Sequence, residues 1–273
     1  MSTLDARKKV TLSSLQKLKE QGKKFACITA YDATFAQLAS SAGIEVILVG
    51  DSLGMVVQGH DSTLPVTMDD ILYHLRMVQR GNAGALLMGD MPFMSYYSEG
   101  LTLENAAQLI RNGAQIVKLE GGAWIAASAR LLVERGIPVC AHMGLTPQSI
   151  NRFGGFRVQG RDPAQAQSML DEALLLQGAG ASLLLLEAVP LQLAQRITEA
   201  LAIPVIGIGA GPHVDGQIMV MHDLLGITPA DIKTPKFVKN FLQESHNGIA
   251  GAFAAYAEAV KNGSFPDLQH SYE

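Results

Sequence analysis

The sequence predicts one (β/α)8 barrel over residues 1–273, and three observations support this fold class. The length of 273 residues is close to the roughly 250 that such a barrel needs. Short, nearly continuous apolar runs alternate with helical segments, as in a parallel sheet that is covered on both faces. Several runs end in Asp or Glu, and in a barrel all strands open onto one face at their carboxyl ends. A doubly wound open sheet would show the same alternation and stays as the alternative.

The elements follow from the pattern in chain order. Residues 11–22, with leucines spaced by three, predict an amphipathic helix that covers the bottom of the barrel. Strands are predicted at 25–31, 46–51, 85–91, 115–120, 138–144, 182–188 and 204–210. Helices are predicted at 33–43, 68–81, 103–113, 125–136, 163–180 and 190–201. Several of these helices end in Gly, which favours the left-handed turn toward the next strand.

The last part of the barrel is less regular in sequence. The eighth strand is placed within 217–228, a segment that also fits the beginning of a helix. Residues 236–266 are predicted to be helical, and the polar segments 1–10 and 267–273 to be flexible tails. Two connections, 54–70 and 145–162, are longer than a barrel requires, and loops of this length are commonly lids or binding loops.

Composition limits the classes of function. The formal net charge of -4 gives no basic surface for nucleic acid or an anionic membrane. No segment resembles a signal peptide or approaches the roughly 20 apolar residues of a membrane span, so a cytoplasmic location is expected. Cys27 and Cys140 lie in apolar runs and are expected to act as small hydrophobic residues rather than as a disulfide.

Composition also bears on assembly. Hydrophobic residues make up 48% of the chain and charged residues only 17%, which suggests that part of the surface is buried between subunits. The Ala- and Gly-rich segment 248–260 is a candidate for close packing against a partner chain. A homo-oligomer is therefore expected. The alternative is that this helix covers the outer wall of the barrel.

Three carboxylates are predicted to form a metal site. Asp51, Asp90 and Glu120 end the second, third and fourth strands, which places them side by side around the mouth of a barrel. Acidic groups so close together repel one another unless a cation lies among them, and oxygen ligands indicate Mg²⁺ rather than zinc. Lys118 stands two residues before Glu120, so it faces the same inward side and compensates negative charge. Taken singly, each acid also fits a helix cap.

Other polar residues end strands on the far side of the mouth. Glu187 follows four leucines and is the candidate for accepting and donating a proton, with a helix cap as the alternative. His142, at the end of the fifth strand, is a candidate donor to a substrate carbonyl and fits a packed core histidine equally well. Four more residues are candidates for lining the mouth, with no role separable from packing: Tyr31, Asp32, His60 and Asp61.

Taken together, the motifs point to a known family. ITAYD, VGDSLGMVVQGHDSTLPVT, LMGDMPF, VKLEGG, HMGLTPQS, LEAVP and IPVIGIGAG resemble those of the ketopantoate hydroxymethyltransferase family, from about residue 11 to about residue 265. The resemblance implies a barrel of the phosphoenolpyruvate and pyruvate superfamily, Mg²⁺, 5,10-methylenetetrahydrofolate as co-substrate, and a decamer. It also implies that Asp51 and Asp90 bind the metal, that Glu120 joins them directly or through water, and that Glu187 is the proton acceptor. The 2-oxo acid is then expected to contact Asp51, Ser52, Asp90, Lys118 and His142.

The reaction that the resemblance implies is transfer of a hydroxymethyl group to 3-methyl-2-oxobutanoate, giving 2-dehydropantoate and tetrahydrofolate in pantothenate biosynthesis. The metal would polarise the oxo acid, and loss of the C3 proton would give an enolate that attacks the one-carbon unit. A lyase of the same superfamily, splitting a C–C bond, is the rival enzyme class, and a cysteine in a mouth loop would favour it. A non-catalytic barrel is the third alternative.

Overall fold

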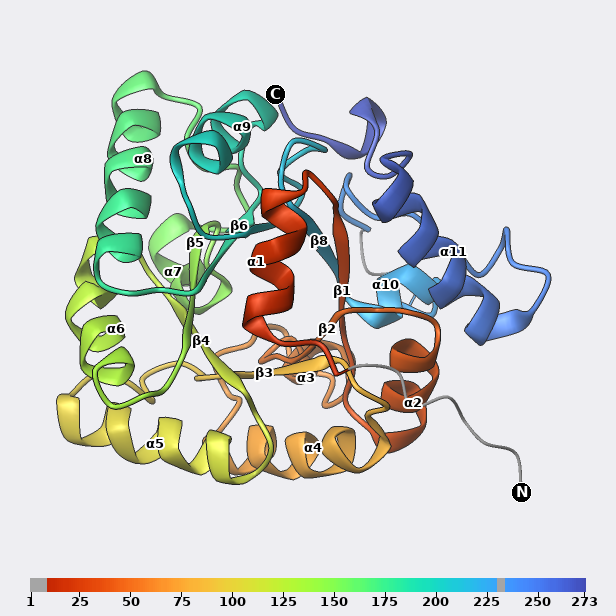
Figure 1. Cartoon of the computed structure of the whole chain (residues 1–273), viewed down its shortest axis with the longest axis horizontal. Helices are drawn as coiled ribbons and strands as arrows, with labels where there is room; N and C mark the ends of the chain where they lie inside the picture. Colours follow the sequence, from red (N-terminus) through yellow and green to blue (C-terminus); the bar gives the residue numbers. More distant parts are fainter. Residues whose placement is uncertain (1–8, 230–233) are drawn as a thin grey trace.

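The structure, a computed structural model, describes residues 9–229 and 234–273. Eight parallel strands pair in sequence order, and β8 pairs with β1, so the sheet closes into a barrel. Figure 1 shows the helices arranged around the outside of the strands. The predicted (β/α)8 fold is confirmed, and the open-sheet alternative is excluded. Residues 1–8 of the predicted amino-terminal tail lie outside the described residues.

The strands are β1 (Phe25–Thr29), β2 (Val46–Val49), β3 (Leu86–Asp90), β4 (Ile116–Glu120), β5 (Val139–Gly144), β6 (Leu183–Glu187), β7 (Val205–Ile208) and β8 (Gly216–Met219). The α-helices are α1 (Leu12–Glu20), α2 (Ala33–Ser41), α3 (Leu53–Val56), α4 (Met68–Gly81), α5 (Glu99–Arg111), α6 (Ala126–Val133), α7 (Ile150–Phe153), α8 (Pro163–Gly178), α9 (Leu191–Ala200), α10 (Met221–Leu225) and α11 (Gly248–Asn262). Short 3-10 turns are η1 (Ala123–Ile125), η2 (Pro147–Ser149) and η3 (Leu268–His270).

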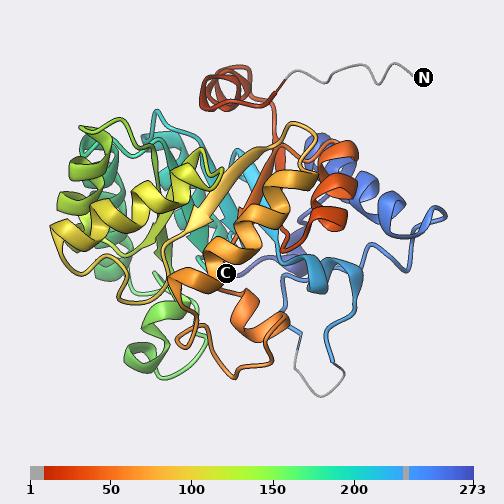
Figure 2. The ribbon, with the colours of Figure 1, turned by 90° about the horizontal axis from the view of Figure 1, so that it is seen from below.

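Two sets of apolar side chains form the core. Side chains that point inward from the strands fill the barrel, including the free thiols of Cys27 and Cys140, while alternate side chains pack outward against the helices. Leu15 of α1 is fully buried and closes the barrel interior from one end. Figure 2 shows α1 (red) at that end and the connections that carry α3 (orange) and α7 (green) at the opposite end. The predicted role of the amino-terminal helix is confirmed.

The eighth strand lies at the beginning of its predicted segment. β8 occupies Gly216–Met219, and α10 begins at Met221, so the segment 217–228 contains both the end of the strand and a short helix. The helical prediction for 236–266 holds only from Gly248, because residues 236–247 form turns, bends and irregular chain. The five-residue α10 is too short to cover β8 and β1, and α11 contacts β1 and α2 from outside.

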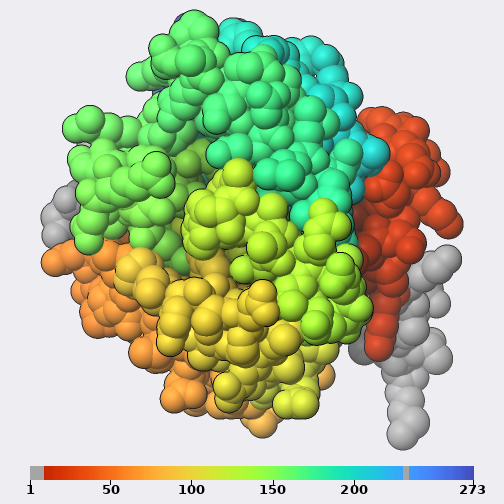
Figure 3. All heavy atoms as spheres, turned by 90° about the vertical axis from the view of Figure 1, so that its left-hand side faces the viewer, coloured from red at the N-terminus to blue at the C-terminus, as the bar shows by residue number. Residues whose placement is uncertain are grey.

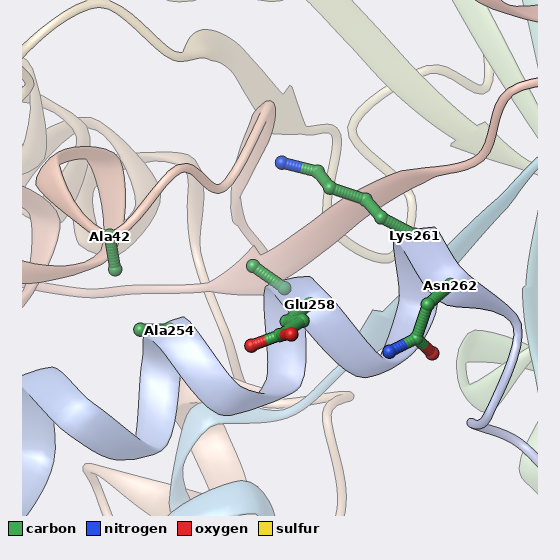
Figure 4. A pocket seen from close by; sticks show the side chains of 6 residues that line it. Ala42, Ala254, Glu258, Lys261 and Asn262 are labelled. Carbon is green, nitrogen blue, oxygen red and sulfur yellow. The ribbon is translucent and has the colours of Figure 1, made fainter.

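The Ala- and Gly-rich helix α11 thus serves as the outer cover of the barrel. Its inward face buries Phe253 and Tyr256, and the Tyr256 hydroxyl lies 2.9 Å from the carbonyl oxygens of both Cys27 and Gln217, to which it donates. Its outward face borders a shallow hollow of about 420 Å³ beside α2, in which Glu258 and Lys261 are seen (Figure 4). The composition of this helix is explained by packing within the chain, so it does not by itself support a subunit interface.

The carboxyl-terminal segment 267–273, predicted to be a flexible tail, makes defined contacts. The backbone N–H of Leu191 donates to the carbonyl oxygen of Tyr272 at 2.9 Å, and Ser271 is buried. The Asp267 side chain accepts from the backbone of η3 at 2.8 and 3.1 Å. The polar residues that suggested mobility therefore cap a turn and hold the end of the chain against α9.

The outer wall opposite α11 is formed by α5, α6 and α8 (yellow to green in Figure 3). Leu174 and Leu175 of α8 are exposed on it. Within residues 9–229 and 234–273, no helix combines the length and the apolar character needed to cross a bilayer.

Candidate active site

The strands β3 to β6 place five polar side chains at one end of the barrel interior. Inward and outward positions alternate along a strand, so Asp90, Lys118, Glu120, His142 and Glu187 follow the inward apolar residues of their strands. The parallel register puts Asp90 opposite Lys118, and Glu120 opposite His142. The sequence-predicted residues therefore come together, as expected for one sector of a barrel mouth.

Lys118 is the charged centre of this cluster. Its ammonium group donates to both oxygens of Asp90, at 2.8 and 2.7 Å, and to Glu120 Oε1 at 3.1 Å. Burial lowers the pKa of a lysine, but here the neighbouring carboxylates outweigh it, and the pKa of Lys118 is raised well above its usual value. Lys118 therefore stays charged and neutralises part of the buried acid cluster.

Asp51 lies just beyond β2 and is buried. Its backbone N–H donates to Asp90 Oδ2 at 3.0 Å, and its own Oδ2 accepts from Gln148 Nε2 at 2.9 Å. Burial, and then the charge of Asp90, raise its pKa well above the usual value. Among the described residues no ion pair involves Asp51. Burial and the neighbouring acids disfavour the charged form of this carboxyl group, and a cation bound beside it would favour that form.

Glu120, His142 and Glu187 form a line across the mouth. His142 Nδ1 lies 3.2 Å from Glu120 Oε1, and its Nε2 lies 3.2 Å from Glu187 Oε2, an ion-pair distance without hydrogen-bond geometry. Burial raises the pKa of Glu120, but Lys118 and His142 outweigh it and hold the pKa at about 2. Burial likewise opposes protonation of His142, yet Glu120 raises its pKa to about 9. The imidazolium therefore links the two carboxylates.

The backbone around Glu187 is held in an unusual conformation. Ala188 has φ of 48°, in the left-handed region that non-glycine residues seldom adopt. Gly144, at φ of 91°, passes so close that a Cβ there would lie 2.3 Å from the Glu187 carbonyl oxygen. That oxygen accepts from the N–H of Leu145 at 2.9 Å. This arrangement fixes the direction in which the Glu187 side chain, about one-sixth exposed (17%), enters the mouth.

Sequence reasoning missed two residues of the site. Gln148 of η2 and Tyr96, in the connection after β3, are both buried beside the acids. The backbone N–H of Gln148 donates to Glu120 Oε2 at 2.9 Å, and the Tyr96 hydroxyl donates to Gln148 Oε1 at 2.7 Å. Both residues come from connections rather than strand ends. The sequence signals for Gln148 are its place in the long connection 145–162 and in the motif HMGLTPQS, neither of which gives the direction of its side chain.

Within the described part of the chain, the remaining candidates make no hydrogen bond or ion pair with Asp51, Asp90, Glu120 or Glu187. The Tyr31 hydroxyl and Ser52 Oγ are 2.9 Å apart, and burial raises the pKa of Tyr31, so the phenol stays protonated. Asp32 caps α2 by accepting from the N–H of Phe35 at 2.9 Å, which is the helix-cap role rather than a chemical one. His60 and Asp61 are exposed in the connection before α4.

The donor set fits the predicted divalent cation only in part. Among the described residues, no group of three or more His, Cys, Asp or Glu side chains has a ligating arrangement. Lys118 contacts both oxygens of Asp90, and the oxygens of Glu120 accept from Lys118, His142 and the N–H of Gln148. Asp51, which forms no ion pair with a described side chain, and the adjacent Asp90 offer oxygen ligands that fit a hard cation. The Glu120 oxygens already contact Lys118, His142 and the N–H of Gln148, so this carboxylate is less available to a cation than that of Asp51.

Comparison with known proteins gives a consistent result. The family model described as ketopantoate hydroxymethyltransferase matches residues 9–268. A 3-methyl-2-oxobutanoate hydroxymethyltransferase of Stutzerimonas stutzeri (strain A1501) is 57% identical over 263 residues, covering 96% of this chain and 98% of the relative. The enzyme of the same description from Shewanella frigidimarina (strain NCIMB 400) is 59% identical over 264 residues, covering 97% and 99%.

Solved structures agree on the fold. Phosphonopyruvate hydrolase superposes with a TM-score of 0.61 at 14% identity, covering 80% of this chain and 84% of that one. 2,3-Dimethylmalate lyase, described as a PEP mutase/isocitrate lyase superfamily member, gives a TM-score of 0.57 at 18% identity, covering 76% and 80%. At such identities the likeness concerns the barrel alone.

Proposed function

The chain belongs to the ketopantoate hydroxymethyltransferase family, and from this premise we propose that its acid cluster binds Mg²⁺ and that its one-carbon donor is 5,10-methylenetetrahydrofolate. The chain is an enzyme that transfers a hydroxymethyl group to 3-methyl-2-oxobutanoate, the first step of pantothenate biosynthesis. The observation that carries the metal proposal is the buried Asp51 carboxylate, which lies beside Asp90 and forms no ion pair with any described side chain.

The acidic and the cationic side chains of the site have different proposed roles. Asp51 and Asp90 would hold the metal, which when bound withdraws electron density from the 2-oxo acid and makes its C3 proton more acidic. The substrate is an anion, and the charged Lys118 and His142 favour its carboxylate and oxo oxygens at the same mouth. Ser52 would add a hydroxyl donor, held in place by the Tyr31 hydroxyl.

Glu187 is the group best placed to accept the C3 proton. The other acids are occupied: Lys118 engages Asp90 and Glu120, and Gln148 donates to Asp51. Glu187 is partly open to the mouth, and its carboxylate lies beside His142. The imidazole of His142, with Nε2 3.2 Å from Glu187 Oε2, would hold the side chain in place during proton transfer. The substrate would lie between Glu187 and the metal-binding acids.

The metal proposal predicts a titration result. Mg²⁺ added to the purified protein should bind at one site per chain, and binding should tighten when 3-methyl-2-oxobutanoate is present, because the oxo acid supplies further oxygen ligands. Isothermal titration calorimetry with and without the oxo acid measures this. Asp51→Asn, which keeps the shape and removes the charge, should weaken binding. Unchanged Mg²⁺ affinity in Asp51→Asn would refute the proposed site.

Assembly is a second prediction. We expect a homo-oligomer, and a decamer by the family resemblance, although the composition of α11 does not support it. The supporting observation is a set of exposed large apolar side chains in the connections and on α8: Phe93, Met94, Tyr97, Trp124, Phe156, Leu174 and Leu175. Light scattering at micromolar concentration measures the mass. A single-chain mass would contradict any oligomer, and a stable dimer or tetramer would contradict the decamer alone.

The structure does not show the feature that would favour the lyase alternative. That alternative called for a cysteine in a connection at the mouth, whereas Cys27 and Cys140 are both buried inside the barrel. The cytoplasmic location inferred from the sequence stays a prediction.

A further inference from the structure

We propose that Gln148 is a positioning residue, whose side-chain amide orients the Asp51 carboxylate for metal binding. The inference rests on the metal site proposed above. It deepens that proposal, because it assigns a role to a residue that neither carries charge nor ends a strand.

The contacts of Gln148 reach four different parts of the mouth. Its Nε2 donates to Asp51 Oδ2 at 2.9 Å and to the carbonyl oxygen of Met91 at 3.0 Å. Its Oε1 accepts from the Tyr96 hydroxyl at 2.7 Å, and its backbone N–H donates to Glu120 Oε2 at 2.9 Å. Both N–H bonds of the amide are used, and the side chain is buried. A buried amide with every donor satisfied has one orientation.

The Met91 carbonyl oxygen decides which end of the amide faces Asp51, and the Tyr96 hydroxyl fits the same orientation. Burial raises the pKa of the Tyr96 phenol, so its hydroxyl keeps its proton and donates. The carbonyl oxygen of Met91 can only accept a hydrogen bond, so the amide atom 3.0 Å from it and 2.9 Å from Asp51 Oδ2 must be the NH2 nitrogen. The amide oxygen then lies 2.7 Å from the Tyr96 hydroxyl, which is also 3.1 Å from the carbonyl oxygen of Glu120. A flipped amide would bring its oxygen against Asp51 and its NH2 group against the phenol. The stack of Tyr96 on Trp124, with ring centroids 5.8 Å apart, holds the phenol in place.

The orientation of the Asp51 carboxylate depends on the Gln148 amide, whereas the carboxylates of Asp90 and Glu120 have charged partners. Asp90 and Glu120 are each held by Lys118, and Glu120 also by His142. The hydrogen bond that Asp51 Oδ2 accepts comes from Gln148, which leaves the other oxygen, Oδ1, to face a cation. Hydrogen bonds that orient ligating carboxylates typically change metal affinity by about 10- to 100-fold when they are removed.

The test uses Mn²⁺ as a spectroscopic probe for the divalent cation, in the full-length protein without substrates. Gln148→Met keeps the length of the side chain and removes both polar atoms. Free Mn²⁺ measured by EPR should show binding weakened by about 10- to 100-fold. In activity assays, the Mg²⁺ concentration for half-maximal rate should rise by a similar factor, while kcat at saturating Mg²⁺ changes much less.

The matched control is Gln159→Met. Gln159 is also a buried glutamine of the connection 145–162, but its amide contacts the Arg157 carbonyl oxygen and Gln165 rather than an acid. The Gln159→Met variant should bind Mn²⁺ with the same affinity as the unaltered protein. Equal weakening in Gln148→Met and Gln159→Met would overturn the inference, because any disturbance of the connection would then have the same effect.

Two further variants keep the outcomes separate. Tyr96→Phe removes the hydroxyl that fixes the amide and should weaken Mn²⁺ binding in the same direction, by a smaller factor. If Gln148→Met fails to fold, unchanged affinity in Tyr96→Phe overturns the inference. Asp51→Asn tests the premise: if it binds Mn²⁺ as the unaltered protein does, the proposed metal site is wrong. If it weakens binding and Gln148→Met does not, only the role of Gln148 is wrong.

Discussion

Replacing Glu187 by Gln should slow exchange of the C3 proton of 3-methyl-2-oxobutanoate by a factor of about 10² to 10⁴, the usual contribution of a positioned acid or base. The amide keeps the shape of the side chain and its place 3.2 Å from His142 Nε2 but cannot accept a proton. The exchange is followed by NMR in D2O with metal and oxo acid alone. Because folate is absent, the measurement isolates proton transfer from the later attack on the one-carbon unit.

The control for this variant is Glu199→Gln. Glu199 is an exposed acid of α9 and should leave the exchange rate unchanged. Binding of the oxo acid and of Mg²⁺ to Glu187→Gln should persist, since the cationic Lys118 and His142 remain. Exchange at the unaltered rate in Glu187→Gln would assign the proton to another group. Loss of oxo-acid binding would show instead that Glu187 organises the mouth.

The acids of the site are predictable from sequence because the fold determines where strands end. Once the runs are identified as parallel strands, Asp90, Glu120 and Glu187 must share a face, whatever the connections do. Lys118 follows by the two-residue period of a strand, and its contact with Asp90 at 2.7 Å bears this out. The sequence of a strand reveals these residues because a polar side chain at an inward position stands out among apolar neighbours.

Gln148 escapes the same reasoning for a physical reason. It lies in a turn after β5, where polar residues are common and no periodicity gives the direction of a side chain. Only the three-dimensional path of the connection brings its amide to Asp51. The helix α11 shows a related limit: its small, apolar residues predict close packing, but the sequence does not tell whether the partner is another subunit or, as observed, the barrel wall.

The ion pairs of Lys118 lead to the second large expected effect. Lys118→Met should lower the free energy of unfolding by about 3 to 5 kcal/mol at pH 7, the usual result of removing one partner from a buried ion pair. The variant leaves Asp90 and Glu120 buried without their shared cation. Urea unfolding at a fixed protein concentration measures the change. Lys239→Met is the control, because Lys239 pairs with Glu244 at the surface and its loss should cost less than about 1 kcal/mol.

The pH dependence of this loss distinguishes charge from packing. Burial raises the pKa of Asp90, and Lys118 opposes that rise, so removing the lysine raises the pKa further. A carboxyl group with a raised pKa binds its proton more tightly in the folded chain, so the folded state gains stability as the pH falls from that pKa toward the unfolded value of about 3.9. The difference between Lys118→Met and the unaltered protein should therefore be largest near neutral pH and shrink toward about pH 4. A difference that stays constant over this range would mean that the variant loses the packing of the lysine side chain, and that the carboxylates are neutralised by other groups.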